Sequence, residues 1–236
     1  MGLFLIGSGV SFDLTLEGLR LLKECDEIYI ETYTNPIELA KISELEKQIS
    51  KKITLLERSH LESSYLVDKA KSSKVAIIAS GDPLTATTHI TLVLEARQKG
   101  VEVKVIHNSS IHSVAAARSG LQIYRFGKTA SLVNPKENYK PTSSLEIVRE
   151  NLSRNLHTLV LLDTEPKPME AKDALEMLKE FKFAVVISRA ACADEKITYG
   201  KVSELIKQKN NLGKAPFAII IPAKLHPIEE EYLNQL

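Results

Sequence analysis

The feature that most constrains the fold is a series of short, apolar-rich runs that alternate with helical patterns. Seven such runs predict strands, at 3–6, 27–30, 75–79, 101–106, 159–162, 184–187 and 217–221. Several are apolar at every position, which is typical of strands covered on both faces. Apolar residues at helical spacing predict helices near 16–22, 37–49, 145–152 and 171–178, with Thr15, Ser143 and Ser203 as expected N-caps. This alternation predicts an α/β fold with mainly parallel sheets.

The length of 236 residues suits one large or two small domains. One boundary stands out after the run that ends at 106, where residues 107–119 are expected to form a loop and a short helix. We place it near residue 112, which gives an N-terminal α/β domain, 1–112, and a C-terminal α/β domain, 113–236. Residues 134–142, with two prolines, are expected to form a polar loop.

Composition excludes several classes of function. The chain has 31 Lys and Arg against 30 Asp and Glu, so it lacks the basic excess of a nucleic-acid binder or a polybasic membrane tether. The apolar start, 1–10, lacks the charged n-region and cleavage site of a signal peptide, and no stretch is long enough to span a bilayer. Cys25 and Cys192 fit reduced thiols, and no histidine or cysteine spacing suggests a metal site. We expect a cytoplasmic protein.

Two glycine turns follow expected strands. Gly7-Ser8-Gly9 follows the first, but Phe12 stands where a dinucleotide fingerprint needs its third glycine. Ser80-Gly81-Asp82-Pro83 follows another strand, at the end where open α/β sheets bind ligands. Asp82 could face a cationic or polyhydroxy ligand there, or it could only stabilise a turn.

Other motifs are individually less specific. Residues 85–89 (TATTH) could cap a helix or line a pocket, and residues 107–112 (HNSSIH) follow another strand. Gly127-Lys128-Thr129 imitates the end of a P-loop, but Gln122 stands where the first glycine belongs and Thr129 is expected to begin a strand. His226, after the last strand, could bind a ligand or bond a loop.

The order of these motifs, from residue 1 to the C-terminus, resembles that of the diphthine synthases, S-adenosylmethionine-dependent methyltransferases with the tetrapyrrole-methylase-like fold. The matching pieces include Gly7-Ser8-Gly9, Gly81–His89, Ser110-Ile111, Ile123–Lys128, Pro141–Ser143, Leu156–Asp163 and Pro222–His226. The first turn is shorter than in the family's pattern, and Ala191 stands where relatives tend to have glycine. The connection Lys179–Phe183 is also shorter than usual.

The resemblance implies two α/β domains that hold S-adenosylmethionine in a cleft between them, in a homodimer. It implies that translation elongation factor 2 is the substrate, on a histidine that carries a 3-amino-3-carboxypropyl group. The amino group would be methylated repeatedly, with S-adenosylhomocysteine as product. Carried over by position, the cofactor contacts would fall on Val10, Asp82, Thr85, Ser110, Ile111, Leu162, Ala190 and His226.

No catalytic residue is assigned. The sulfonium of S-adenosylmethionine is already activated, so the protein need only align the nucleophile and exclude water. His89 and His112 have a suitable intrinsic pKa to take the amine proton, but solvent could serve equally well. The alternatives are a methyltransferase of the same fold acting on a small tetrapyrrole, which the start of the chain only partly matches, and a non-catalytic cofactor-binding module. An NAD-dependent enzyme is poorly supported.

Overall fold

The computed structural model describes residues 1–32, 37–61, 63–134, 142–165, 167–208 and 211–236. The chain divides into two compact units, Met1–Ser110 and Ile111–Leu236. The boundary predicted from the sequence lies two residues later, and an independent pair of domains with a cleft between them stays a prediction. Most of the predicted polar loop 134–142 lies outside the described residues.

The first unit contains a fully parallel sheet of order β3-β2-β4-β1-β5. Its strands are β1 (Gly2–Gly7), β2 (Glu27–Glu31), β3 (Thr54–Leu56), β4 (Lys74–Ala79) and β5 (Val103–Ile106). The sequence predicted all of them except β3, whose three residues are too few to show a period. The α/β class and the parallel arrangement are confirmed in this unit.

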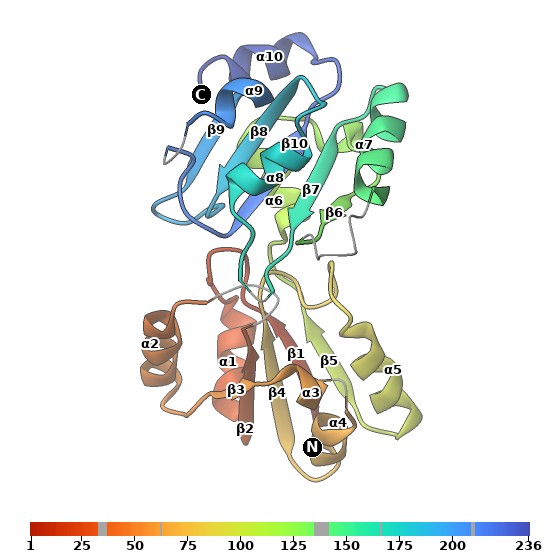
Figure 1. Cartoon of the computed structure of the whole chain (residues 1–236). Helices are drawn as coiled ribbons and strands as arrows, with labels where there is room; N and C mark the ends of the chain where they lie inside the picture. The colour runs from red at the N-terminus through yellow and green to blue at the C-terminus, as the bar shows by residue number, and fades with distance from the viewer. Residues whose placement is uncertain (33–36, 62, 135–141, 166, 209–210) are drawn as a thin grey trace. The chain divides into compact units, whose positions relative to one another are not determined.

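Helices cover both faces of this sheet (Figure 1). On one face lie α1 (Leu16–Glu24) and α2 (Leu39–Ile49), and on the other α3 (Arg58–Leu61), α4 (Tyr65–Ala70) and α5 (Ile90–Gln98). Helix α1 begins at its predicted cap, because the Thr15 side chain accepts a hydrogen bond from the Gly18 N–H at 3.0 Å. The helices that follow β1 and β4 thus pack on opposite faces, which makes the carboxyl ends of these neighbouring strands a topological switch point.

The second unit has a mixed sheet of order β6-β7-β10-β8-β9. Its strands are β6 (Ala130–Leu132), β7 (Thr158–Leu162), β8 (Phe183–Ser188), β9 (Lys196–Lys201) and β10 (Phe217–Ile221). The β6–β7 pair is parallel, but β7–β10, β10–β8 and β8–β9 are antiparallel. The expectation of a mainly parallel sheet is therefore corrected for this unit. The apolar runs reported burial on both faces correctly, but burial does not encode strand direction.

Helices also cover both faces of the second sheet. On one face lie α7 (Ser143–Ser153), α8 (Ala171–Met177) and α9 (Val202–Leu205), and on the other α6 (Ile111–Ser119) and α10 (Pro227–Leu233), near the 3₁₀ turn η1 (Ile123–Arg125). The predicted caps Ser143 and Ser203 lie inside α7 and α9, which Thr142 and Lys201 precede. Among the described residues, no helix has the length and apolarity needed to cross a bilayer.

Candidate functional site

The two glycine turns meet at the switch point of the first sheet. Gly9 and Gly81 bond each other through both N–H groups, at 3.0 and 3.1 Å, in an isolated antiparallel bridge. Both have left-handed backbones, with φ of 70° and 69°. A Cβ on Gly7 would lie 2.6 Å from the Gly81 carbonyl oxygen, so the two loops approach too closely for any side chain there. These glycines therefore serve the contact between neighbouring loops.

Asp82 lies at the centre of these loops and is only 6% exposed. Its Oδ1 accepts hydrogen bonds from the Leu84 N–H at 3.0 Å and the Thr85 hydroxyl at 3.1 Å. Its Oδ2 accepts from His107 Nδ1 at 2.8 Å and the Asn108 N–H at 3.3 Å. Burial alone would raise the pKa of Asp82, but these hydrogen bonds outweigh it and hold that pKa below its ordinary value. Asp82 is therefore a carboxylate that joins its own loop to the segment after β5.

The Asp82 carboxylate has little spare capacity for a ligand, because a carboxylate offers about four acceptor sites. His107 is the most replaceable of its partners, since the His107 side chain is 67% exposed. The motif at 107–112 did not indicate a role for His107. The signal that was available is its position directly after β5 (Val103–Ile106), beside β1 in the sheet.

The segment after β5 completes this edge of the sheet. Ser109 Oγ accepts a hydrogen bond from the Val10 N–H at 3.2 Å, and Asn108 Nδ2 donates to the carbonyls of Gly7 at 3.0 Å and Asp13 at 2.9 Å. Ser110 ends the first unit. The first unit thus gathers four residues of the implied cofactor set at the carboxyl ends of β1, β4 and β5: Val10, Asp82, Thr85 and Ser110. Ile111 is the first residue of α6, in the second unit.

In the second unit, Leu162 ends β7 and Ala190 follows β8, so both lie at the same edge of the sheet. Ala190 is flanked by left-handed backbone at Arg189, with φ of 49°, and Ala191, with φ of 60°. The Arg189 N–H donates to the Pro216 carbonyl at 2.9 Å, which ties this turn to the start of β10.

Glu195 holds the other side of the Ala190 turn. Its Oε2 accepts from the Ala191 N–H at 2.6 Å, and Arg118 Nε donates to both carboxylate oxygens, at 2.8 and 3.0 Å. Burial alone would raise the pKa of Glu195, but the bonds from Arg118 and Ala191 outweigh it and lower that pKa. The turn at Ala190 is therefore stabilised by the Glu195 carboxylate, which none of the sequence motifs indicated.

His226 lies at the opposite edge of the second sheet from Leu162 and Ala190. Strand β10 is antiparallel to β7, and its last residue, Ile221, pairs with Thr158 at the start of β7. The five residues of β7 separate the two edges by roughly 13–17 Å. The structure therefore does not bring His226 together with Leu162 and Ala190, although all three belong to the implied cofactor set.

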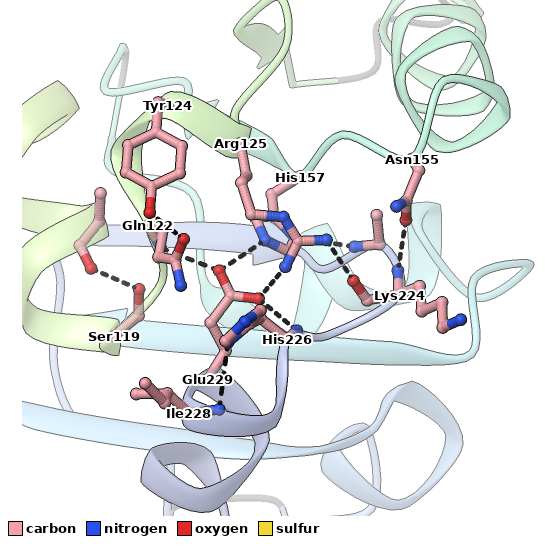
Figure 2. Close-up of polar contacts among 12 residues, drawn as sticks. Ser119, Gln122, Tyr124, Arg125, Asn155, His157, Lys224, His226, Ile228 and Glu229 are labelled. Carbon is pink, nitrogen blue, oxygen red and sulfur yellow. Dashed lines mark hydrogen bonds and ion pairs between the residues drawn. The ribbon is translucent and has the colours of Figure 1, made fainter.

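His226 is the N-cap of α10. Its Nδ1 accepts from the Ile228 N–H at 3.4 Å, and its own N–H donates to Glu229 Oε2 at 2.8 Å (Figure 2). This reciprocal arrangement is a capping box, in which a histidine takes the place of the usual serine or threonine. His226 was expected either to bind a ligand or to hydrogen-bond a loop, and the contacts in the structure are of the second kind.

Buried Glu229 is the centre of this second cluster (Figure 2). Besides His226, its carboxylate accepts from the Gln122 N–H at 3.0 Å, from His157 Nε2 at 3.2 Å and from Arg125 Nη1. Burial alone would raise the pKa of Glu229, but these donors lower it. The carboxylate thus joins three motif segments: 123–128, 156–163 and 222–226.

His157 is neutral in this cluster. Its Nδ1 accepts from the Ala223 N–H at 2.9 Å, so its proton lies on Nε2, which donates to Glu229. Burial lowers the pKa of His157, although Glu229 opposes the shift. His157 lies inside the motif 156–163, but that motif did not indicate its partner Glu229, which lies 72 positions away.

The two histidines considered as proton acceptors occupy different surroundings. His89 is 2% exposed, and its Nδ1 donates to the Pro83 carbonyl at 3.0 Å, so its side chain is buried and hydrogen-bonded within the first unit. His112 lies on α6 and is partly buried, and burial lowers its pKa. The geometry therefore does not support His89 as the group that receives the amine proton, and burial makes His112 a weaker proton acceptor.

The comparisons with known proteins agree along the whole chain. A family model described as tetrapyrrole (corrin/porphyrin) methylases matches residues 2–206. A diphthine synthase of Methanocaldococcus jannaschii is 39% identical over 95% of this chain and 93% of that protein. One from Methanothermobacter thermautotrophicus is 34% identical over 99% of this chain and 95% of that protein.

Solved structures give the same result. A crystal structure of diphthine synthase has a TM-score of 0.90 and 34% identity, covering 99% of this chain and 94% of that one. A putative diphthine synthase from Entamoeba histolytica has a TM-score of 0.87 and 32% identity, covering 99% of this chain and 97% of that one. The chain therefore belongs to the tetrapyrrole methylase family and, within it, to the diphthine synthases.

Proposed function

We propose that this protein transfers methyl groups from S-adenosylmethionine to the amino group of a 3-amino-3-carboxypropyl-histidine on translation elongation factor 2, in diphthamide biosynthesis. The observation that carries the proposal is the joining of three loops, 7–15, 80–89 and 107–110, at the switch point of a parallel sheet in a chain that is similar to diphthine synthases over its full length. Open α/β sheets bind ligands at this point.

The chemistry of the loops suits S-adenosylmethionine. None of the three loops contains Lys or Arg, whereas the first loop contains Asp13 and the second contains Asp82. Such loops favour a cationic ligand over a phosphate, and S-adenosylmethionine carries a sulfonium and an ammonium group but no phosphate. Lys41 approaches the first loop, where its Nζ donates to the Ser11 carbonyl at 2.8 Å.

Each residue of the proposed site has a task in this account. When bound, the cofactor supplies a methyl group that is already activated on sulfur. Val10 and Ser110 offer main-chain groups, and Thr85 stays fixed by Asp82, whose negative charge favours the sulfonium. Ile111, Leu162 and Ala190, in the second unit, belong to the proposed set by resemblance. His226 belongs to the proposed set by resemblance, although it caps a helix at the other sheet edge.

Catalysis in this account is alignment and exclusion of water. The substrate amine must lose its proton before each attack, and we infer that solvent receives it, because His89 is buried and bonded to Pro83. We also infer a cytoplasmic homodimer that contacts the protein part of the translation machinery. The near balance of 31 basic and 30 acidic residues supports the absence of direct nucleic-acid binding.

Calorimetry with S-adenosylhomocysteine, ATP and NAD tests the ligand class. We expect binding of the first alone, and loss of that binding in Asp82→Ala. Incubation with labelled S-adenosylmethionine and either modified elongation factor 2 or a small tetrapyrrole precursor then tests the substrate class. Label in the tetrapyrrole but not in the factor would refute the proposal, as would tight NAD binding. Sedimentation of the purified protein tests the homodimer.

A further inference from the structure

The loop between β4 and α5 is closed through one carbonyl group, that of Pro83. The Thr87 hydroxyl donates to this oxygen at 2.7 Å, and His89 Nδ1 lies 3.0 Å from it. Because a carbonyl oxygen can only accept, His89 carries a proton on Nδ1. These bonds draw the two ends of the loop 83–89 together. Asp82, which immediately precedes Pro83, is therefore fixed to the same point.

The loop adopts a conformation that requires such closure. Ala86 lies at its tip with φ of 57°, in the left-handed region that disfavours residues with a Cβ. Strained backbone of this kind persists where the surrounding structure enforces it, and it gathers at ligand-binding sites. Thr87 and His89 supply the enforcing contacts on one side, and Asp82 supplies them on the other through Thr85.

Glu31 faces the other ring nitrogen of His89. The side chain of Glu31, at the end of β2, is fully buried, and its Oε2 lies 3.9 Å from His89 Nε2. Strand β2 is a direct neighbour of β4 in the sheet, where Ile30 pairs with Ile78 (Figure 1). The imidazole, at 2% exposure, therefore lies between a carboxylate on the sheet and a carbonyl of the loop, and of these two contacts the one with the Pro83 carbonyl is within hydrogen-bond distance.

We propose that His89 is a positioning residue: it acts through the Pro83 carbonyl to hold the loop 83–89, and Asp82 before it, in the conformation that binds the cofactor. The proposal rests on the proposed function, because it assumes that Asp82 and Thr85 belong to the cofactor site. His89 touches neither cofactor nor substrate amine in this account. Its removal weakens cofactor binding by allowing the strained loop to relax.

The test compares three substitutions that separate the two contacts of the ring. Asn places an amide nitrogen where His has Nδ1 and so preserves a donor to Pro83, whereas Gln reaches toward the Nε2 position and Ala preserves neither. We expect His89→Ala and His89→Gln to bind S-adenosylhomocysteine roughly 10- to 100-fold more weakly, the loss that follows removal of the groups that orient metal ligands. His89→Asn should restore most of the affinity.

Val93→Ala is the matched control. Val93 lies on α5, of which His89 is the N-cap, has 4% exposure and packs in the core of the first unit, and its apolar side chain makes no hydrogen bond to the Pro83 carbonyl. It should lower the melting temperature without changing the Kd for S-adenosylhomocysteine, measured by calorimetry below the melting range of every variant. In turnover, His89→Ala and His89→Gln should raise KM for S-adenosylmethionine and leave kcat on elongation factor 2 near wild type, and His89→Asn should keep KM close to the wild-type value.

Failure of this inference is distinguishable from failure of the proposed function. If wild-type protein does not bind S-adenosylhomocysteine, the proposed function is wrong. If wild-type protein binds and His89→Ala loses no more affinity than Val93→Ala, the positioning role is refuted. Equal weakness of His89→Asn and His89→Ala would refute the assignment to the Pro83 contact, and a fall in kcat with unchanged KM would contradict a role in cofactor binding.

Discussion

Replacing Gly7 by alanine tests the joining of the two glycine turns. The new Cβ would lie 2.6 Å from the Gly81 carbonyl oxygen and 3.0 Å from Pro83 Cδ and Asn108 Cβ. The first of these neighbours is backbone, so no side-chain rotation relieves the clash. Gly7 does not have a left-handed backbone, so the perturbation is steric. The loops after β1 and β4 must therefore move apart.

The expected size of the effect follows from this geometry. Forcing an extra carbon into a packed site costs about 1–3 kcal/mol. If the loops relieve this strain by separating, restoring their arrangement on ligand binding costs up to the same amount. A free-energy cost of about 1–3 kcal/mol on ligand binding corresponds to about a 5- to 150-fold loss of affinity. The melting temperature should fall by about 2–4 °C for each 1 kcal/mol lost, in chains of this length.

Gly100→Ala provides the control. Gly100 also has a left-handed backbone, with φ of 70°, but a Cβ there would meet nothing within 4 Å. The strain of a left-handed alanine is about 1–2 kcal/mol, similar to the expected loss in Gly7→Ala. Calorimetry with S-adenosylhomocysteine should find normal affinity in Gly100→Ala and weak affinity in Gly7→Ala. Equal affinities in the two variants would refute the reasoning.

Three further predictions follow from other parts of the chain. The folded-state pKa values of Asp82, His157 and Glu229 all lie below their ordinary values of 3.8, 6.5 and 4.5, so protonation favours the unfolded state. Melting temperature should therefore fall as pH drops, first below about 6.5 through His157 and then near 4 through the carboxylates; a rise between pH 7 and 5 would contradict this. Ala191→Gly removes a Cβ from a backbone with φ of 60° and should raise the free energy of unfolding by about 1 kcal/mol, measured with urea; a decrease would contradict the left-handed geometry. Burial raises the pKa of Cys25 to about 11, while Cys192 is partly exposed, so native protein at pH 8 should show one fast reaction with a thiol reagent and a second only after unfolding. Persistence of the fast reaction in Cys192→Ser would contradict that prediction.

Sequence pattern was sufficient for the strands that are continuously apolar and for the class of fold, because such runs report burial on both faces, but it missed β3 and β9. It was insufficient for the direction of strands in the second sheet. Strands β8 and β9 pair antiparallel, with Phe183 opposite Lys201 and Ser188 opposite Lys196, yet β8 is as apolar as any parallel strand. Strand direction depends on connections and pairing partners, which local periodicity does not record.

The candidate site was predictable where a motif also has a local structural cause. Gly7, Gly81 and Asp82 follow strands that pair, so their loops lie together. The anchors of the site were not predictable in this way. His107 binds Asp82 from 25 positions away, and Glu229 binds His157 from 72 positions away. Such pairs exist only once the sheets have formed, and a single sequence holds no trace of the pairing.

The most direct test of the central claim is mass spectrometry of the modified-histidine peptide of elongation factor 2. The factor should carry the 3-amino-3-carboxypropyl group and be incubated with this protein and S-adenosylmethionine. The account predicts a mass increase by whole methyl groups, located on the amino group of that histidine, and a slower increase in Gly7→Ala at low cofactor concentration. An unchanged peptide, in a preparation that binds S-adenosylhomocysteine normally, would contradict it.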